Sequence, residues 1–70
     1  MGESISSRVN KLRLEQGVTQ EGLAEAVGVS RQTIIAIEKG NYVPSVLLAL
    51  KIARFFELPV EQVFKISHEK

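Results

Sequence analysis

Residues 19–40 read TQEGLAEAVGVSRQTIIAIEKG. Thr19 and Ser30 each stand where a side-chain hydroxyl can accept a hydrogen bond from a free amide in the first turn of a helix. Gly28 and Gly40 each follow an apolar pattern of helical period and suit the left-handed turn that ends a helix. The stretch therefore predicts two short helices joined by a short turn. These helices cover residues 20–27 and 31–38.

Three further helices flank this pair. The helical spacing of Ile5, Val9 and Leu12 indicates an amphipathic first helix. Ser45 is a plausible cap for a strongly apolar run, and Pro59 breaks that run before one or two more helical turns. The three helices are expected over residues 5–16, 46–56 and 60–64.

The expected fold class is therefore all-α. Five helices joined by short connections form one compact domain over residues 1–70, with a helix-turn-helix motif over about residues 20–38. After residue 64, polar and apolar residues alternate, which allows a short C-terminal strand without requiring one. No strand is expected before residue 65.

Length and composition limit what the domain can do. A chain of 70 residues buries only about 60% of the surface it exposes when unfolded, so it often gains stability from self-association. It contains no Cys, which suits the cytoplasm, and residues 1–16 lack the apolar segment of a signal peptide. The longest apolar run has five residues, far too few to cross a membrane. We expect a soluble cytoplasmic protein without a membrane partner.

The side chains needed for catalysis are missing. The chain has one histidine, His68, no Asp and no Gly-rich phosphate loop, and its Glu residues are not paired. We therefore expect no enzyme activity, metal, cofactor or small-molecule substrate. The net charge of +1 is also far from the excess of a non-specific nucleic-acid binder, so a nucleic-acid role has to rest on local placement of charge.

Over residues 4–64 the chain resembles the lambda-repressor-like, Xre-type family of DNA-binding domains. The resemblance rests on several short matches: Thr19-Gln20 with Leu23-Ala24, the run from Gly28 to Ile34, Ile37-Glu38 with Gly40, Pro44-Ser45, and the ending from Leu58 to Phe64. It implies that the second helix of the motif enters the major groove of double-stranded DNA.

The resemblance assigns base contacts to the start of that second helix. The residues implied are Ser30, Arg31, Gln32, Thr33 and Ala36. Their chemistry fits, because Arg can pair with guanine, Gln with adenine, and Thr or Ala can touch a thymine methyl group. From spacing alone, Arg31 and Gln32 could equally be solvated first-turn residues. Ile35, on the outer side of the same helix, is either a lone exposed apolar residue or a contact to a thymine methyl group or the DNA backbone.

Phosphate contacts are implied on both sides of the motif. The residues are Thr19, Gln20, Lys39, Asn41 and Tyr42, and Gln20 is also implied to brace the second helix of the motif. The loop after the second helix carries less positive charge than its counterpart in phage repressors, so non-specific affinity should be weak. Tyr42 could instead be a packing residue.

Two further features follow from the resemblance. Arg13 and Glu38 match positions that form a largely buried ion pair, and the alternative is two ordinary surface charges. The apolar C-terminal end implies a homodimer interface at Val60, Val63, Phe64 and Ile66, whose tail could pair with that of a second copy. Alternatively, Phe64 folds back onto the helices.

The sequence thus favours a sequence-specific transcriptional regulator, a repressor that binds a palindromic operator as a homodimer. One alternative is an antitoxin that uses the same helix on DNA and also binds a toxin protein. The other is a protein-interaction module that has lost its DNA affinity.

Overall fold

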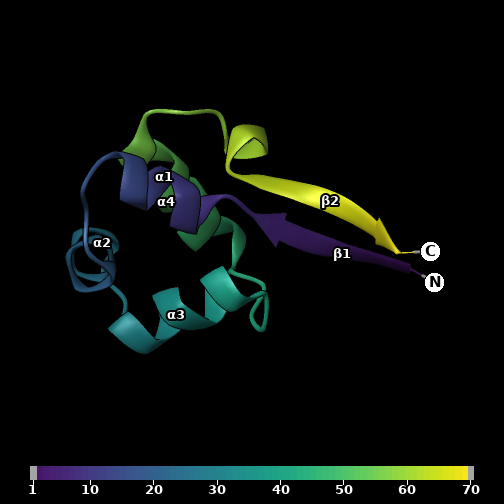
Figure 1. The fold of residues 1–70 in the computed structure, drawn as a ribbon, viewed down its shortest axis with the longest axis horizontal. Coiled ribbons are helices and arrows are strands. Elements are labelled where there is room, and N and C mark those ends of the chain that lie inside the picture. The colour runs from purple at the N-terminus through teal and green to yellow at the C-terminus, as the bar shows by residue number, and fades with distance from the viewer. Residues whose placement is uncertain (1, 70) are drawn as a thin grey trace.

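The computed structural model describes residues 2–69, and the side chains of residues 3–67. The helices form a rounded body, and two strands project from it as an arm with both ends of the chain at its tip (Figure 1). In chain order the elements are β1 (Gly2–Ser7), α1 (Val9–Glu15), α2 (Gln20–Val27), α3 (Arg31–Lys39), α4 (Val46–Phe56), the 3₁₀ turn η1 (Val60–Gln62) and β2 (Phe64–Glu69).

Local capping explains where three helices begin. The hydroxyls of Thr19, Ser30 and Ser45 each accept a hydrogen bond from the backbone N–H three residues later, at the start of α2, α3 and α4. Gly28 and Gly40 end α2 and α3 with φ of 80°, a conformation that costs a glycine little. The predicted bounds of α2 and α4 are confirmed, and α3 is one residue longer than expected.

The first helix and the helix count have to be corrected. The helix expected over residues 5–16 begins only at Val9, because the residues before it form β1. Within residues 2–69 there are four α-helices and a 3₁₀ turn, in place of five helices. The last helix, expected over residues 60–64, is reduced to that turn, and the chain continues as β2. The fold is mostly helical with a small sheet.

Pairing between the two ends of the chain explains the missed strand. β1 and β2 are antiparallel, with Ile5 opposite Ile66 and Ser7 opposite Phe64. This pairing prevails over the helical spacing of the apolar residues, and serine is a weak helix former. The backbone N–H of Arg8 then donates to a carbonyl of the η1–β2 junction at 2.9 Å. The expectation of no strand before residue 65 was wrong, and the C-terminal strand that the sequence allowed is present.

The core fixes the orientation of α3. The largest fully buried side chains come from five different segments and are Val9, Leu23, Ile34, Ile37, Ile52 and Val63. Two of these six belong to α3. Because its inner face is held in the core, the opposite face of α3 must point to solvent.

Gly22 is the third residue of α2, and glycine inside a helix costs up to about 1 kcal/mol relative to alanine. A Cβ atom at this position would lie 3.0 Å from the Oγ1 atom of Thr19, which is tighter than most real contacts. That oxygen accepts the cap hydrogen bond from the Gly22 N–H at 2.9 Å. The glycine therefore leaves room for the cap.

Candidate nucleic-acid interface

A tight turn places α3 at the edge of the body. The amides of Gly28 and Val29 both donate to the carbonyl of Ala24, at 2.9 and 3.0 Å, and so close the end of α2. Val29 is half-buried and packs against the core. The chain therefore changes direction within three residues, and α3 runs along one edge of the molecule (Figure 1).

The five base-contact candidates differ in how free they are to bind. The hydroxyl of Ser30 lies 3.3 Å from the amide of Thr33 and 3.1 Å from its hydroxyl, so these two residues bond to each other as a cap. Ala36 is half-buried. Arg31 and Gln32 are exposed, and within residues 3–67 neither side chain has a hydrogen-bond partner. These two are the polar side chains best placed to bond to a ligand.

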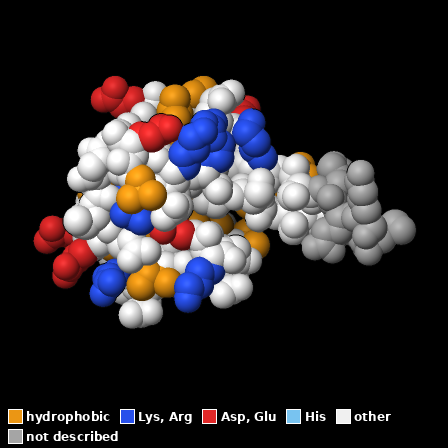
Figure 2. Space-filling view, in the orientation of Figure 1, with side chains coloured by type: hydrophobic (Ala, Val, Ile, Leu, Met, Phe, Trp, Pro, Cys, Tyr) orange, Lys and Arg blue, Asp and Glu red, His pale blue; other side chains and the backbone are white. Residues whose placement is uncertain are grey.

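The outer side of α3 is apolar at its centre and basic at its ends. Arg31 lies in its first turn and Lys39 at its last residue, and both are exposed. Figure 2 shows hydrophobic side chains between two groups of basic ones along this edge of the molecule. The basic ends of this edge can contact a polyanion, and its apolar middle can contact an apolar group on the same ligand.

The start of α2 forms a polar hollow beside α3. It is shallow and open to solvent, has a volume of about 520 Å³, and is lined by Arg13, Thr19, Gln20, Glu21 and Arg31. The first amides of a helix lack partners within the helix and attract anions. The Nε2 atom of Gln20, however, donates to the Glu38 carboxylate at 3.1 Å. Gln20 thus has its amide turned towards the body, and its phosphate contact remains a prediction.

The last residue of α3 and the loop after it expose the other three phosphate candidates, Lys39, Asn41 and Tyr42. The backbone N–H of Asn41 donates to the carbonyl of Ala36 at 2.9 Å, so this amide closes the helix and is not available to a phosphate. Tyr42 is 46% exposed and also lines a hollow with Ile37, so it is neither fully packed nor fully solvated.

The Glu38 carboxylate joins three helices behind this surface. Arg13 donates to it through Nε at 2.8 Å and Nη2 at 3.3 Å, Asn10 through Nδ2 at 3.0 Å, and Gln20 through Nε2 at 3.1 Å. The side chains of Arg13 and Glu38 are 10% and 6% exposed. The ion pair implied by the resemblance is therefore present and buried, and the bond from Gln20 to Glu38 agrees with the implied brace of α3, whereas the donor Asn10 was not expected.

These contacts also change the acidity of Glu38. Burial alone raises the pKa of its carboxyl group, because it disfavours the charged form. The hydrogen bonds from Arg13, Asn10 and Gln20, together with the positive charge of Arg13, outweigh burial, so the pKa lies below its ordinary value of 4.5. Glu38 is consequently ionised at neutral pH and holds α3 against α1 and α2.

The four residues expected at a dimer interface lie in different environments. Val63 is fully buried in the core, so we leave it out of the interface. Val60 and Phe64 are half-buried and pack against the core, as in the alternative in which Phe64 folds back. Ile66 is 62% exposed. The hydrogen-bonded neighbour of its strand is β1 of the same chain, and this pairing adds Ile5, 38% exposed, to the same face.

Two expected absences can be examined directly. Within the described residues, no three His, Cys, Asp or Glu side chains gather as metal ligands would. None of the helices in that part of the chain combines the length and the hydropathy needed to cross a bilayer.

Residues 9–63 match the model of the helix-turn-helix family HTH_3. The chain belongs to this lambda-repressor-like, Xre-type helix-turn-helix family. Members of the family are DNA-binding transcriptional regulators. The family assignment inferred from the turn and its capping residues is thereby confirmed.

Helix-turn-helix relatives cover nearly the whole chain. YgzD of Bacillus subtilis (strain 168), an uncharacterised HTH-type transcriptional regulator, is 52% identical over 65 residues, which are 93% of this chain and 98% of YgzD. RstR, the cryptic phage CTXphi transcriptional repressor of Vibrio cholerae, is 34% identical over 63 residues, 90% of this chain and 57% of RstR. The crystal structure of the restriction-modification controller protein C.AhdI from Aeromonas hydrophila is similar with a TM-score of 0.74 and 29% identity, covering 79% of this chain and 83% of that one.

Proposed function

We propose that this protein is a cytoplasmic repressor that binds a palindromic operator as a homodimer, with α3 in the major groove. The observation that carries the proposal is the first turn of α3. Arg31 and Gln32 are exposed there without protein partners among the described side chains, while the other face of the helix is fixed by the core and by Glu38. A relative, RstR, is itself named a transcriptional repressor.

Base reading and positioning fall to different residues. Arg31 can donate two hydrogen bonds to the O6 and N7 atoms of guanine, and Gln32 can pair with adenine. Each such bidentate contact contributes about 1–3 kcal/mol of discrimination against the wrong base. Exposed Lys39 and the hollow at the start of α2 bind phosphates, which positions the protein without reading sequence.

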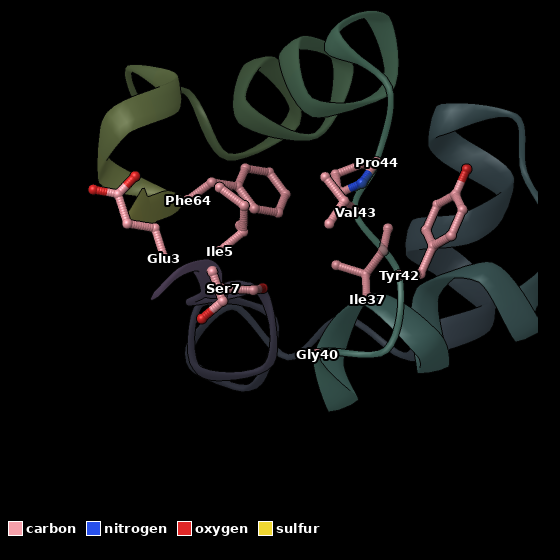
Figure 3. Close-up of a pocket in the computed structure, with 10 residues that line it drawn as sticks. Glu3, Ile5, Ser7, Ile37, Gly40, Tyr42, Val43, Pro44 and Phe64 are labelled. Carbon is pink, nitrogen blue, oxygen red and sulfur yellow. The ribbon is translucent and has the colours of Figure 1, made fainter. Parts of the chain in front are cut away.

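The arm provides the surface for a second copy. An isolated pair of strands is only marginally stable in water unless something covers its apolar face. Here Ile5 and Ile66 are paired across the two strands and both are exposed. Figure 3 shows Ile5 and Phe64 facing Val43 and Pro44 of the loop after α3, across a hollow of about 270 Å³. The arm of a second copy covers this apolar face.

A dimer built on this face sets the form of the operator. Two recognition helices related by two-fold symmetry read a palindrome whose half-sites lie about 10 base pairs, or ~34 Å, apart. A single domain with a net charge of only +1 would bind DNA weakly, because each phosphate contact adds only a small, salt-dependent share of the affinity.

Selection from a pool of random DNA duplexes, at a low and a high salt concentration, tests the proposal. We expect a palindrome with half-sites about 10 base pairs apart. Binding should weaken steeply with salt, since phosphate contacts release counterions. No enrichment at low salt would reject DNA binding and favour a protein partner; enrichment of a single unrepeated site would reject the homodimer.

Two arginine variants make the test specific to α3. Arg31→Ala should sharply reduce the preference for the selected duplex over a scrambled one, by the roughly 1–3 kcal/mol of one bidentate contact in each half-site. Arg54→Ala removes an exposed arginine from α4, outside the proposed surface, and should leave that preference unchanged. Equal effects of the two substitutions would mean that α3 is not the reading helix.

A further inference from the structure

Ile35 lies in the middle of the outer side of α3, yet the core does not explain it. Six half-buried apolar side chains within residues 3–67 pack against the core, and Ile35 is not among them. It is itself half-buried, with Arg31 one turn before it and Lys39 one turn after it. Residues four apart are neighbours on a helix, so these two long side chains flank it.

The rotation of α3 places Ile35 among the base-reading candidates. Ile34 and Ile37 are buried and fix which side of the helix faces inward. At 3.6 residues per turn, Ile35 lies about 40° around the helix axis from Arg31 and about 60° from Gln32, between the two. Ile35 therefore lies on the same side of the helix as these two side chains, about one turn further along, beside the bases that they contact.

The chemistry of this side chain selects what it can contact. Isoleucine has no donor or acceptor, and it would leave the polar edges of guanine, cytosine or adenine without hydrogen bonds. The one apolar group that a base presents in the major groove is the 5-methyl group of thymine. A β-branched side chain in a helix is also held in one main rotamer, so the contact loses little conformational entropy.

We infer that Ile35 reads the 5-methyl group of a thymine in each operator half-site, next to the base contacted by Arg31. This inference rests on the proposed DNA binding through α3. The protein would then recognise its operator by the positions of thymine methyl groups as well as by the hydrogen bonds of its polar side chains.

Replacing thymine by deoxyuridine tests the inference, because the exchange removes the methyl group and keeps every hydrogen-bonding atom. The probe is the duplex enriched from the random pool, resynthesised with each thymine exchanged in turn. Each half-site should contain one thymine whose exchange lowers the affinity about fourfold. This is the effect expected from the loss of one buried methyl group. Exchange in both half-sites should lower it about 16-fold, if the two act independently.

Variants of Ile35 assign the methyl contact to this side chain. Ile35→Ala should bind the thymine and deoxyuridine duplexes equally well at that position, and Ile35→Val should retain most of the difference. Leu14→Ala truncates an apolar side chain that is 63% exposed on α1 and should keep the full difference.

The outcomes separate this inference from the proposal beneath it. If the pool yields no enriched duplex, the proposed DNA binding fails and the inference fails with it. If a duplex is enriched and Ile35→Ala still distinguishes thymine from deoxyuridine as the wild type does, the role of Ile35 is refuted while DNA binding stands. The same holds if no thymine exchange affects wild-type binding.

Discussion

Replacing Glu38 by alanine should disrupt the junction of α1, α2 and α3. The substitution removes the carboxylate that accepts hydrogen bonds from Arg13, Asn10 and Gln20. It leaves the guanidinium group of Arg13 buried, with its Nε and Nη2 atoms unpaired and only its Nη1 contact to the carbonyl of Val18 intact. The remaining charge is then buried without its counter-ion.

The expected loss is large compared with the stability of so small a domain. Removing one partner of a buried ion pair typically costs about 3–5 kcal/mol. A chain of 70 residues has a total unfolding free energy of roughly 3.5–10 kcal/mol, at 0.05–0.15 kcal/mol per residue. Since 1 kcal/mol lowers the Tm of such a domain by about 4–8 °C, Glu38→Ala should lower it by about 12 °C or more.

Thermal unfolding followed by circular dichroism at pH 7 measures this loss. Glu15→Ala removes an exposed glutamate from the end of α1 and should change the free energy of unfolding by no more than about 0.5 kcal/mol. Glu38→Gln keeps the size of the side chain and removes its charge, so its Tm should fall between the two. A Tm of Glu38→Ala equal to that of Glu15→Ala would refute the reasoning.

Glu38 should also make the protein less stable at acidic pH. The pKa of Glu38 is lower in the folded protein than its ordinary value of 4.5, so the unfolded chain binds the proton more readily. Its contribution is therefore fully present above pH 4.5 and is lost as the pH falls through the lowered, folded-state value. Chemical unfolding between pH 7 and pH 3 should show a smaller acid loss in Glu38→Gln than in the wild type; parallel curves would contradict this.

Three other substitutions test separate features. Lys39→Ala should weaken binding to all duplexes alike and lower the slope of log affinity against log salt by about one, measured by titration at several salt concentrations; a changed sequence preference would contradict a phosphate role. Gly28→Ala should destabilise the protein by about 1–2 kcal/mol in urea unfolding, because the residue holds a φ of 80°, and an unchanged midpoint would contradict this. Ile66→Lys should shift sedimentation towards the monomer at micromolar concentration, whereas Leu14→Lys, on α1, should not; identical profiles would reject the arm as the interface.

Local signals account for the parts of the fold that the sequence predicted well. The bounds of α2 and α4 follow from hydroxyl caps and from the residues that end each helix, which act within a few positions along the chain. β1 could not be found in this way, because Ile5 is a strand residue only through its pairing with Ile66 at the other end of the chain. Its spacing from Val9 imitated a helix.

The same distinction applies to the candidate surface. The family resemblance assigned Arg31 and Gln32 to DNA, whereas spacing alone left them as ordinary first-turn residues, and the structure leaves both exposed. The resemblance implied that Gln20 braces α3, but the donor Asn10 was not predicted, because its contact with Glu38 depends on how α1 packs against α3. The base and phosphate contacts themselves stay predictions.

The pairing of the two ends of the chain has a consequence for the order of folding. Ser6 donates to the carbonyl of Lys65 in the arm, and these residues are 59 positions apart in sequence. Closing so long a loop costs more entropy than forming a helix from neighbouring residues, and contacts of this kind slow folding. The arm should therefore form after the helical body and open before it. In hydrogen exchange its amides should lose protection first, while those of α4 exchange only on global unfolding.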